Sequence, residues 1–340
     1  MKRLRFAVFG TGFWAQYQLA GWQELDGVEC VALYNRTRSK AEALAARFGI
    51  EQVYDDPEKL LREERPDFID VITGVEANPF FVRMAADHGI PVICQKPMAP
   101  DLASAERMVR TCRAAGVPLM VHENWRFQRP IAEVGRLLRS GKLGRPFRAR
   151  ILYANSYPVF ENQPYLKEIE QFILTDMGSH ILDSARFLFG EAESVFCQTT
   201  QVTPGIRGED VATVMLRMGD GVTVTCALSY ASRVEHDRYN ETYITVECER
   251  GTIDLGPDYW ISVTTRDGTL ARRFAPTHYP WATPEFEIVH ASIVPCNAHL
   301  LEALQSGTPA DTSGADNLET MRLIFAAYES ASTGQVVALS

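Results

Sequence analysis

The seven cysteines of this 340-residue chain are scattered along it, and no two of them stand in C-x-x-C spacing. This lack of pattern argues against a disulfide framework and against a zinc site built on cysteine pairs, and it fits the reducing cytoplasm. No apolar run comes near the roughly 18 residues that a membrane-spanning helix needs. The chain also lacks an excess of positive charge, since its formal net charge is −9, which argues against general nucleic-acid binding.

The chain also lacks internal repeats and low-complexity linkers. Its composition, 46% hydrophobic and 23% charged, is ordinary for a folded globular protein. A chain of 340 residues can bury a large core and is long enough for two domains. A change in the pattern of predicted elements is therefore the best indicator of a domain boundary.

The first predicted strand, Leu4 to Phe9, runs directly into Gly10-Thr11-Gly12-Phe13-Trp14-Ala15. This is the G-x-G-x-x-A variant of the dinucleotide fingerprint, placed between a strand and a helix. Gly10 permits the tight turn, Gly12 lets the backbone approach a pyrophosphate, and Ala15 allows close packing of helix on strand. The amino terminus of the helix then offers unpaired N–H groups to the phosphates. We expect this turn to bind a dinucleotide.

The second predicted strand, Val28 to Tyr34, is followed by Asn35 and Arg36, with Arg38 close by. A site specific for NAD usually has Asp or Glu here, to bind the ribose hydroxyls. Asn35 can still bond a ribose hydroxyl, while an arginine can take the 2′-phosphate of NADP. The alternative is that both arginines are simply solvated at the start of a helix. These residues leave the choice between NAD and NADP open.

Strands and helices alternate from residue 4 to residue 121, which predicts a right-handed, doubly wound parallel sheet. Such sheets bind ligands at the carboxyl ends of their strands. Thr73 ends one predicted strand, and Lys96 follows the apolar strand Val92-Ile93-Cys94. Lys96 is either a solvated lysine at a strand end or an ammonium that faces cofactor and substrate. We expect a Rossmann dinucleotide-binding domain over residues 1–123.

After Asn124 the pattern changes to alternating strands joined by turns such as Gly219-Asp220-Gly221, which are typical of hairpins. Strands are predicted at residues 147–157, 195–203, 211–218, 222–230, 243–248, 252–255, 261–265 and 270–274. Helices are predicted at residues 174–188, 288–306 and 315–330. The fold class is therefore α/β plus α+β, with an open, mostly antiparallel sheet and flanking helices over residues 124–340. This second domain would serve substrate binding and oligomerisation.

Asp176 and His180 stand four residues apart within a predicted helix, which places both on one helical face. A carboxylate beside an imidazole can raise its basicity and fix its tautomer. Metal binding by this pair is a weak interpretation because no third ligand is evident, and we expect no metal. The other alternative is a capping aspartate beside a histidine buried in the core.

Taken together, these segments resemble the glucose–fructose oxidoreductase, inositol dehydrogenase and MocA family (Gfo/Idh/MocA) over nearly the whole chain. The motifs that carry the resemblance are Gly10-Thr11-Gly12, Gln95-Lys96-Pro97, Asn124 with Arg126-Phe127 and Pro130, Asp176 through Asp183, and Ser313-Gly314-Ala315-Asp316 leading to Ala327-Tyr328-Glu329-Ser330. The resemblance implies a pyranose or furanose dehydrogenase with a nicotinamide cofactor. It also implies that Lys96 is the catalytic lysine, Asp176 a substrate-binding carboxylate and His180 the acid–base histidine. Asn124 corresponds to a cofactor-side residue.

Two positions depart from the family pattern. Gln95 stands where the family usually has glutamate, which removes a negative charge beside Lys96 but keeps a hydrogen-bonding side chain. Asn78 stands where the family usually has histidine. A finer resemblance, to the D-apiose dehydrogenase subgroup, favours NAD over NADP. It is carried by Cys94 through Pro100, Phe160-Glu161-Asn162-Gln163-Pro164 and Tyr230 through His236.

The function we expect is oxidation of an aldose, D-apiose on the subgroup resemblance, at its anomeric hydroxyl to a lactone, with hydride transfer to NAD(P)+. His180 would remove the hydroxyl proton, Asp176 would orient it or grip a neighbouring hydroxyl, and Lys96 would stabilise alkoxide charge. The roles of Lys96 and His180 are interchangeable at this stage. Cofactor contacts are expected from Gly10, Thr11, Gly12, Phe13, Trp14, Asn35, Arg36, Thr73, Gln95, Lys96 and Asn124. Substrate contacts are expected from Lys96, Arg126, Tyr157, Phe160, Asn162, Asp176, His180, Arg233 and His236.

Three other functions remain open: oxidation of another sugar or inositol hydroxyl, a redox-neutral glycosidase that uses NAD transiently, and a non-catalytic sensor that binds the dinucleotide. The presence of Lys96, Asp176 and His180 argues against the sensor. The expected partner is a sugar or polyol, with no nucleic acid and no membrane. A homodimer or homotetramer through the second sheet is also expected, because an uncovered apolar face is a liability.

Overall fold

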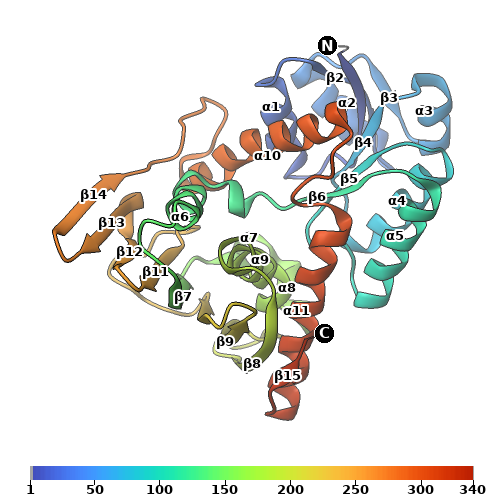
Figure 1. The fold of residues 1–340 in the computed structure, drawn as a ribbon. Coiled ribbons are helices and arrows are strands. Elements are labelled where there is room, and N and C mark those ends of the chain that lie inside the picture. The colour runs from blue at the N-terminus through green and yellow to red at the C-terminus, as the bar shows by residue number, and fades with distance from the viewer. Residues whose placement is uncertain (1–2, 340) are drawn as a thin grey trace. The chain divides into compact units, whose positions relative to one another are not determined.

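The computed structural model describes residues 3–339, and the chain forms two compact units (Figure 1). The first unit contains the residues up to Asn124 together with Tyr279–Ala282 and Ile293–Glu319. The second unit contains Trp125–His278, Thr283–Ser292 and the residues from Thr320 onward. The predicted division into continuous domains 1–123 and 124–340 remains a prediction.

The first unit is built on a six-stranded parallel sheet in the order β3-β2-β1-β4-β5-β6. Its strands are β1 (Leu4–Phe9), β2 (Val28–Tyr34), β3 (Gln52–Tyr54), β4 (Phe68–Val71), β5 (Val92–Gln95) and β6 (Leu119–His122). The helices between them are α1 (Ala15–Gln23), α2 (Arg38–Phe48), α3 (Pro57–Glu64), α4 (Asn78–Asp87) and α5 (Leu102–Ala115). The strand order reverses between β1 and β4, which is where such a sheet binds its ligand. The predicted doubly wound sheet is confirmed.

Local sequence explains where the helices of this unit begin. Asp56 caps α3 by accepting a hydrogen bond from the Lys59 backbone N–H at 3.1 Å, and Pro57 occupies the first helical position. Asp101 caps α5 in the same way through the Ser104 N–H at 2.7 Å. These short-range signals hold the connections in place, so the strands can pack against the helices.

The second unit is built on a nine-stranded sheet in the order β14-β13-β12-β11-β7-β10-β9-β8-β15. Its strands are β7 (Pro146–Ala154), β8 (Ala192–Thr200), β9 (Val211–Met218), β10 (Thr223–Ser229), β11 (Tyr243–Cys248), β12 (Gly251–Leu255), β13 (Trp260–Thr265), β14 (Gly268–Arg273) and β15 (Val337–Ala338). Among the described strands only β7 and β10 pair in parallel, so the predicted mostly antiparallel sheet is confirmed.

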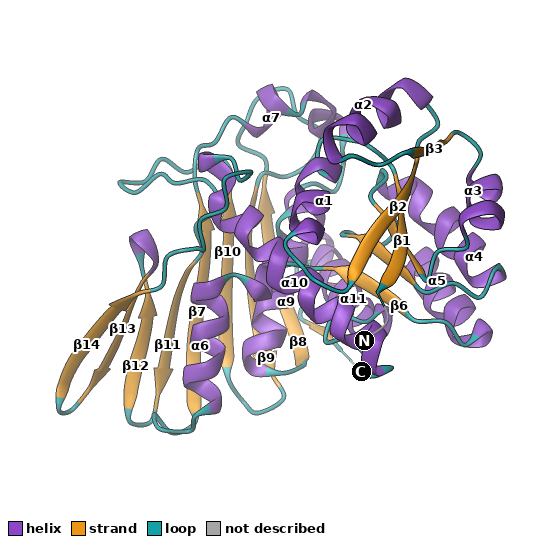
Figure 2. Ribbon diagram, turned by 90° about the horizontal axis from the view of Figure 1, so that it is seen from above, coloured by secondary structure: helices purple, strands orange, loops and turns teal. Residues whose placement is uncertain are grey.

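Helices cover one face of this sheet. The helices α6 (Arg129–Arg139) and α9 (Gly178–Phe189) lie along its strands (Figure 2). Alternate residues of β9 are buried, from Ala212 to Met218, as the period of two predicts. Two long helices, α10 (Glu287–Ser306) and α11 (Gly314–Thr333), lie between β14 and β15 in the chain. Within residues 3–339, no helix combines the length and the hydropathy that crossing a membrane would require.

The single helix predicted over residues 174–188 is wrong, because the chain forms α8 (Ile173–Asp176) and α9, with a break at Met177. The Ser179 hydroxyl donates to the Asp176 carbonyl at 2.7 Å, and the His180 N–H turns to the Met177 carbonyl at 3.1 Å. A side-chain hydroxyl that competes for a backbone carbonyl interrupts a helix in this way. Asp176 therefore ends one helix, and His180 lies in the first turn of the next.

Candidate active-site elements

The turn after β1 has the features that a dinucleotide requires. Gly10 has φ +102°, and a Cβ there would lie 2.4 Å from the Ile72 carbonyl oxygen, so only glycine fits. At Gly12, by contrast, no described atom lies within 4 Å of the place that a Cβ would take, which leaves room for a ligand. The Thr11 hydroxyl is buried and has no hydrogen-bond partner among the described residues. The first turn of α1, described in full, carries no acidic side chain that would repel phosphate.

Arg36 and Arg38, which the sequence could not tell apart, have different contacts after β2. Arg38 forms an exposed ion pair with Glu42 on the same helix, with 2.9 Å between Nε and Oε1. Arg36 is exposed, and no ion pair to it is present within residues 3–339. The Asn35 amide donates to the Thr37 carbonyl at 2.9 Å, which shapes the turn. Arg36 is therefore the arginine available to an added phosphate.

Asn78 contacts the backbone of the segment that carries Lys96. The buried Asn78 amide lies 3.4 Å from the Gln95 carbonyl and 3.3 Å from the Met98 carbonyl. The Thr73 hydroxyl in turn donates to the Asn78 side-chain oxygen at 3.1 Å. An amide at position 78 therefore helps to anchor the turn around Lys96, which gives this departure from the family pattern a structural role.

In the second unit, the Tyr230 hydroxyl donates to Asp176 Oδ2 at 3.0 Å. Tyr230 is buried, stacks on Phe172 with ring centroids 5.7 Å apart, and meets Tyr153 edge-on at 5.8 Å. Burial raises the pKa of Tyr230 well above its ordinary value, and the charge of Asp176 acts in the same direction. The phenol therefore stays protonated and holds the carboxylate by donating to it. The sequence did not predict this partner of Asp176.

His180 lies buried at the start of α9 with its ring flat against Trp125, since the ring centroids are 4.3 Å apart and the planes differ by 21°. Trp125 is itself fixed, because its indole N–H donates to the Thr242 hydroxyl at 3.0 Å. The stacking restrains the plane of the imidazole. A histidine held in one plane is suited to exchanging a proton in one direction.

Arg126, a predicted substrate contact, lies in a buried ion pair. Its Nε and Nη2 reach the two Asp183 oxygens at 2.8 Å and 2.5 Å. Thr320 adds a hydrogen bond to Asp183 at 3.2 Å, and the guanidinium also lies over the Phe187 ring. This pairing ties the segment after Trp125 to α9.

The other predicted substrate contacts are spread over the second unit. Tyr157 stacks on Tyr239 with centroids 3.7 Å apart, and the buried Phe160 packs on Phe172 at 5.1 Å, beside the ring of Tyr230. Arg233 and His236 are exposed on the segment that follows β10. The side chain of Asn162 lies outside those that the structure describes, and Asn124 is buried at the end of the continuous part of the first unit.

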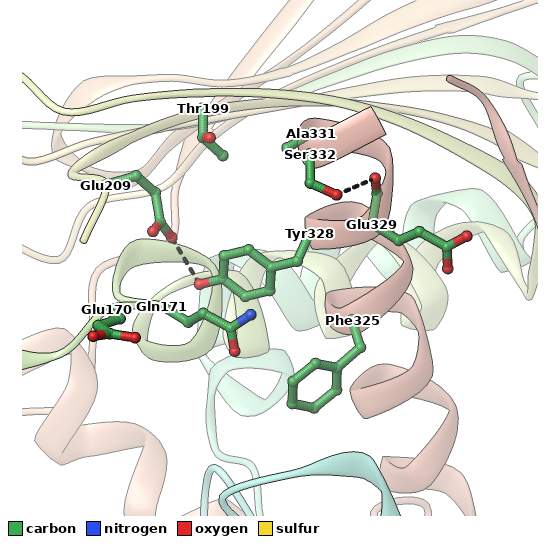
Figure 3. A pocket seen from close by; sticks show the side chains of 9 residues that line it. All are labelled: Glu170, Gln171, Thr199, Glu209, Phe325, Tyr328, Glu329, Ala331 and Ser332. Carbon is green, nitrogen blue, oxygen red and sulfur yellow. Dashed lines mark hydrogen bonds between the residues drawn. The ribbon is translucent and has the colours of Figure 1, made fainter. Parts of the chain in front are cut away.

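A cavity of about 430 Å³ lies in the second unit (Figure 3). Its lining consists of Glu170, Gln171, Thr199, Glu209, Phe325, Tyr328, Glu329, Ala331 and Ser332, none of them a predicted site residue. Glu209 accepts hydrogen bonds from the Phe172 and Leu174 N–H groups at 3.2 Å and from the Tyr328 hydroxyl at 2.7 Å. Glu209, on one side of the cavity, therefore fixes the start of α8, the helix that ends at Asp176. Within the described residues, no three His, Cys, Asp or Glu side chains gather as metal ligands.

Comparison with known proteins links these elements to a family. Residues 4–123 match the model described as an oxidoreductase family with an NAD-binding Rossmann fold, and residues 131–254 match the GFO/IDH/MocA C-terminal domain. The chain is 42% identical to a D-apiose dehydrogenase of Paraburkholderia graminis, over 100% of this chain and 90% of the relative. It is 40% identical to a D-apiose dehydrogenase of Rhizobium rhizogenes, over 99% and 98% of the two chains. A crystal structure of an oxidoreductase from Agrobacterium radiobacter, in complex with NAD+, L-tartaric acid and magnesium, superimposes with a TM-score of 0.97 at 39% identity, covering 99% of this chain and 98% of that one.

Proposed function

Because the chain belongs to the Gfo/Idh/MocA family of NAD(P)-dependent oxidoreductases, we propose that it is a sugar dehydrogenase that oxidises D-apiose at the anomeric hydroxyl to the lactone. The assignment of D-apiose as the substrate rests on the similarity, over essentially the full chain, to two D-apiose dehydrogenases at 42% and 40% identity. The segment from Tyr230 to His236 resembles the same subgroup, and its Tyr230 binds Asp176.

The residues around the β1 turn fit a nicotinamide dinucleotide. The space at Gly12, the buried Thr11 hydroxyl and the amino terminus of α1 would hold its phosphates. Gln95 ends β5, and Asn35, Thr73 and Asn124 come just after other strands of the same unit, where the ribose and nicotinamide contacts of this fold are made. When bound, NAD(P)+ supplies the acceptor for the hydride that leaves the sugar carbon.

The remaining chemistry belongs to side chains of this chain. His180, restrained by Trp125, would take the proton of the anomeric hydroxyl. Asp176, held by Tyr230, would accept a hydrogen bond from the reacting or a neighbouring hydroxyl. Lys96 would stabilise the negative charge that develops on the sugar oxygen. Phe160 and Tyr157 would contribute apolar contacts to the sugar ring.

A sugar panel tests this function directly. Purified enzyme is offered D-apiose, other aldoses and inositols with NAD+ and with NADP+, and NADH or NADPH is followed by absorbance. We expect the highest kcat/KM with D-apiose, and a lactone as the product. If only inositols were turned over, the hydroxyl that is oxidised would be another ring hydroxyl and not the anomeric one. Free sugar released from a glycoside without net NADH would indicate a glycosidase, and tight NAD+ binding without any turnover would indicate a sensor.

Two glycines of the fingerprint are expected to respond in opposite ways. Gly12→Leu should abolish NAD+ binding but leave the thermal unfolding temperature unchanged, because a side chain at Gly12 meets open space in the protein alone. Gly10→Ala should destabilise the fold itself, because its methyl group would meet the Ile72 carbonyl at 2.4 Å. Calorimetry of both variants and titration of Gly12→Leu with NAD+ check this. Unchanged NAD+ affinity in Gly12→Leu would locate the cofactor elsewhere.

We propose a preference for NAD+, in line with the subgroup resemblance and with the NAD+ complex of the structural relative. Arg36→Ala should weaken NADP+ binding by about tenfold, since a hydrogen-bonded charge pair is lost, and should leave NAD+ binding nearly unchanged. Arg38→Ala is the matched control, because Glu42 already engages Arg38. Dissociation constants for both dinucleotides decide the matter, and equal losses for NAD+ and NADP+ would contradict the assignment of Arg36.

The uncovered face of the second sheet supports a homo-oligomer. Leu152 on β7 and Met215 on β9 are exposed on the face away from α9, with Ala227 and Thr225 of β10 as their partners across the strands. An exposed apolar sheet face is a common subunit interface. Met215→Glu should shift the sedimentation coefficient toward that of the monomer, while Ser140→Glu, at the exposed end of α6, should not. A parent protein that sediments as a monomer would refute this interface.

The seven cysteines are free thiols, and six of them are buried. Unpaired thiols in this number are usual in a reducing compartment. We therefore propose that the enzyme works in the cytoplasm on a small sugar, without a nucleic-acid or membrane partner.

A further inference from the structure

A fully buried carboxylate, Asp70, lies in the middle of β4. The Gln18 side-chain amide donates to both of its oxygens, at 2.8 Å and 2.7 Å, and the Trp22 indole N–H donates to Oδ2 at 2.8 Å. Burying a charge is costly unless it is compensated, so a carboxylate retained in a strand interior requires a reason. All three of these residues belong to the first unit.

The contacts of Gln18 allow only one orientation of its side chain. An ionised carboxylate only accepts hydrogen bonds, so the atom of Gln18 that faces Asp70 must be the nitrogen. An indole N–H only donates, and that of Trp14 lies 3.2 Å from the other atom, which must be the oxygen. The contacts with Asp70 and with Trp14 therefore require the same orientation of the Gln18 amide. The Gln18 oxygen also accepts a hydrogen bond from the side-chain nitrogen of Gln95.

We propose that Asp70 is a positioning residue for the cofactor site, acting through Gln18 to fix the carboxamide of Gln95. Gln18 presents an oxygen, so Gln95 must turn its nitrogen inward. The Gln95 oxygen is then directed away from Gln18, as the acceptor for a ribose hydroxyl of the dinucleotide. This inference rests on the proposed function, because it assigns the residue beside Lys96 a defined contact with NAD(P)+.

The same network accounts for glutamine at position 95, where the family usually has glutamate. A carboxylate at this position would set an acceptor against the acceptor oxygen of Gln18. Gln18 cannot relieve this clash by turning over, because Asp70 and Trp14 both oppose the turned orientation. Two acceptors that face each other are destabilising where one of them, here the Gln18 oxygen, is shielded from water. Gln95 and the Asp70–Gln18 pair therefore belong together.

Two thiols lie close enough to Asp70 for its charge to raise their pKa, and neither changes the hydrogen bonds among Asp70, Gln18 and Gln95. Burial raises the pKa of Asp70 to about 7, while the N–H groups of Trp22 and Gln18 act in the opposite direction. Cys30 on β2 and Cys94 on β5 are thiols whose pKa is raised by burial, so both stay neutral. Measurements at a pH of about 8.5 therefore compare variants with Asp70 ionised, because this pH lies above the raised pKa of its carboxyl.

A double-mutant cycle tests the coupling between positions 70 and 95. Gln95→Glu is measured in the parent and in Asp70→Asn by titrating tryptophan fluorescence with NAD+ at the same alkaline pH. In the parent, the substitution should weaken NAD+ binding by about tenfold. In Asp70→Asn the cost should shrink but not vanish, because an asparagine at position 70 can donate to a turned Gln18, so that only the Trp14 indole N–H still opposes a Gln18 nitrogen facing the new carboxylate. Equal factors in both backgrounds would overturn the proposal.

A second measurement needs neither Asp70→Asn nor the cofactor. Thermal unfolding at the same alkaline pH is compared for Gln95→Glu and Gln95→Met, which have similar size. We expect Gln95→Glu to unfold at the lower temperature, because methionine only removes one of the two donors to the Gln18 oxygen and leaves that of Trp14, whereas glutamate repels the oxygen. The reverse order would refute the orientation of Gln18. If the parent binds no NAD+ at all, the proposed function fails, while the unfolding comparison still decides on the network.

Discussion

Replacing His180 by asparagine is expected to lower kcat/KM for sugar oxidation by about a thousandfold, because general-base catalysis by a positioned side chain contributes about 10²–10⁴-fold. Asparagine is flat and short enough to remain against Trp125, so the packing at 4.3 Å should survive the change. The Kd for NAD+ should stay at the parental value, because His180 is assigned to the sugar. Steady-state kinetics and a cofactor titration on the same preparation give both quantities.

The control for this substitution is His88→Asn, at the end of α4 in the first unit, outside every predicted contact. It should leave kcat/KM unchanged. A His180→Asn variant with more than about a tenth of parental kcat/KM would show that no proton passes through this imidazole.

The same kinetics separate the roles of His180 and Lys96. The base must be unprotonated to act, so kcat/KM of the parent falls as the pH drops through its pKa. If His180 is the base, His180→Asn loses this acidic limb and Lys96→Met keeps it at a lower overall rate. If Lys96→Met loses the limb and His180→Asn keeps it, the two residues exchange roles.

The fold of the first unit could be predicted because each of its signals is local. A strand, a turn and a helix start are encoded within a few residues, as Gly10 and the capping residues Asp56 and Asp101 illustrate. The regular alternation then leaves only a parallel sheet as a stable arrangement. The position of Lys96 at a strand end could be predicted by the same logic, since it directly follows β5.

The interior of the candidate site could not be predicted, because its contacts join distant parts of the chain. The break between Asp176 and His180 depends on Ser179 nearby, but the start of α8 is held by Glu209, which lies far along the chain beyond β8. The contact of Tyr230 with Asp176 likewise joins a strand end to a helix end. No periodicity in a sequence records such pairs, because they are set by how the elements pack.

Arg126→Met is expected to lower the free energy of unfolding by about 3–5 kcal/mol, because it takes the Arg126 countercharge away from the buried Asp183. Both side chains are almost entirely shielded from water, at 6% and 0% exposure, so solvent cannot replace the lost partner. Arg217→Met, which breaks an exposed ion pair with Glu193, should leave stability unchanged. Urea unfolding of the three proteins checks this.

The double variant Arg126→Met/Asp183→Leu separates a structural role of Arg126 from the predicted substrate contact. Removing both charges should restore most of the lost stability, because the desolvation cost of each ion disappears with its attraction to the other. If Arg126 only ties the segment after Trp125 to α9, activity returns together with stability and KM for the sugar is parental. If Arg126 also binds the sugar, the double variant is stable but keeps a raised KM. A double variant as unstable as Arg126→Met alone would show that Arg126 stabilises the fold through packing on Phe187 rather than through its charge.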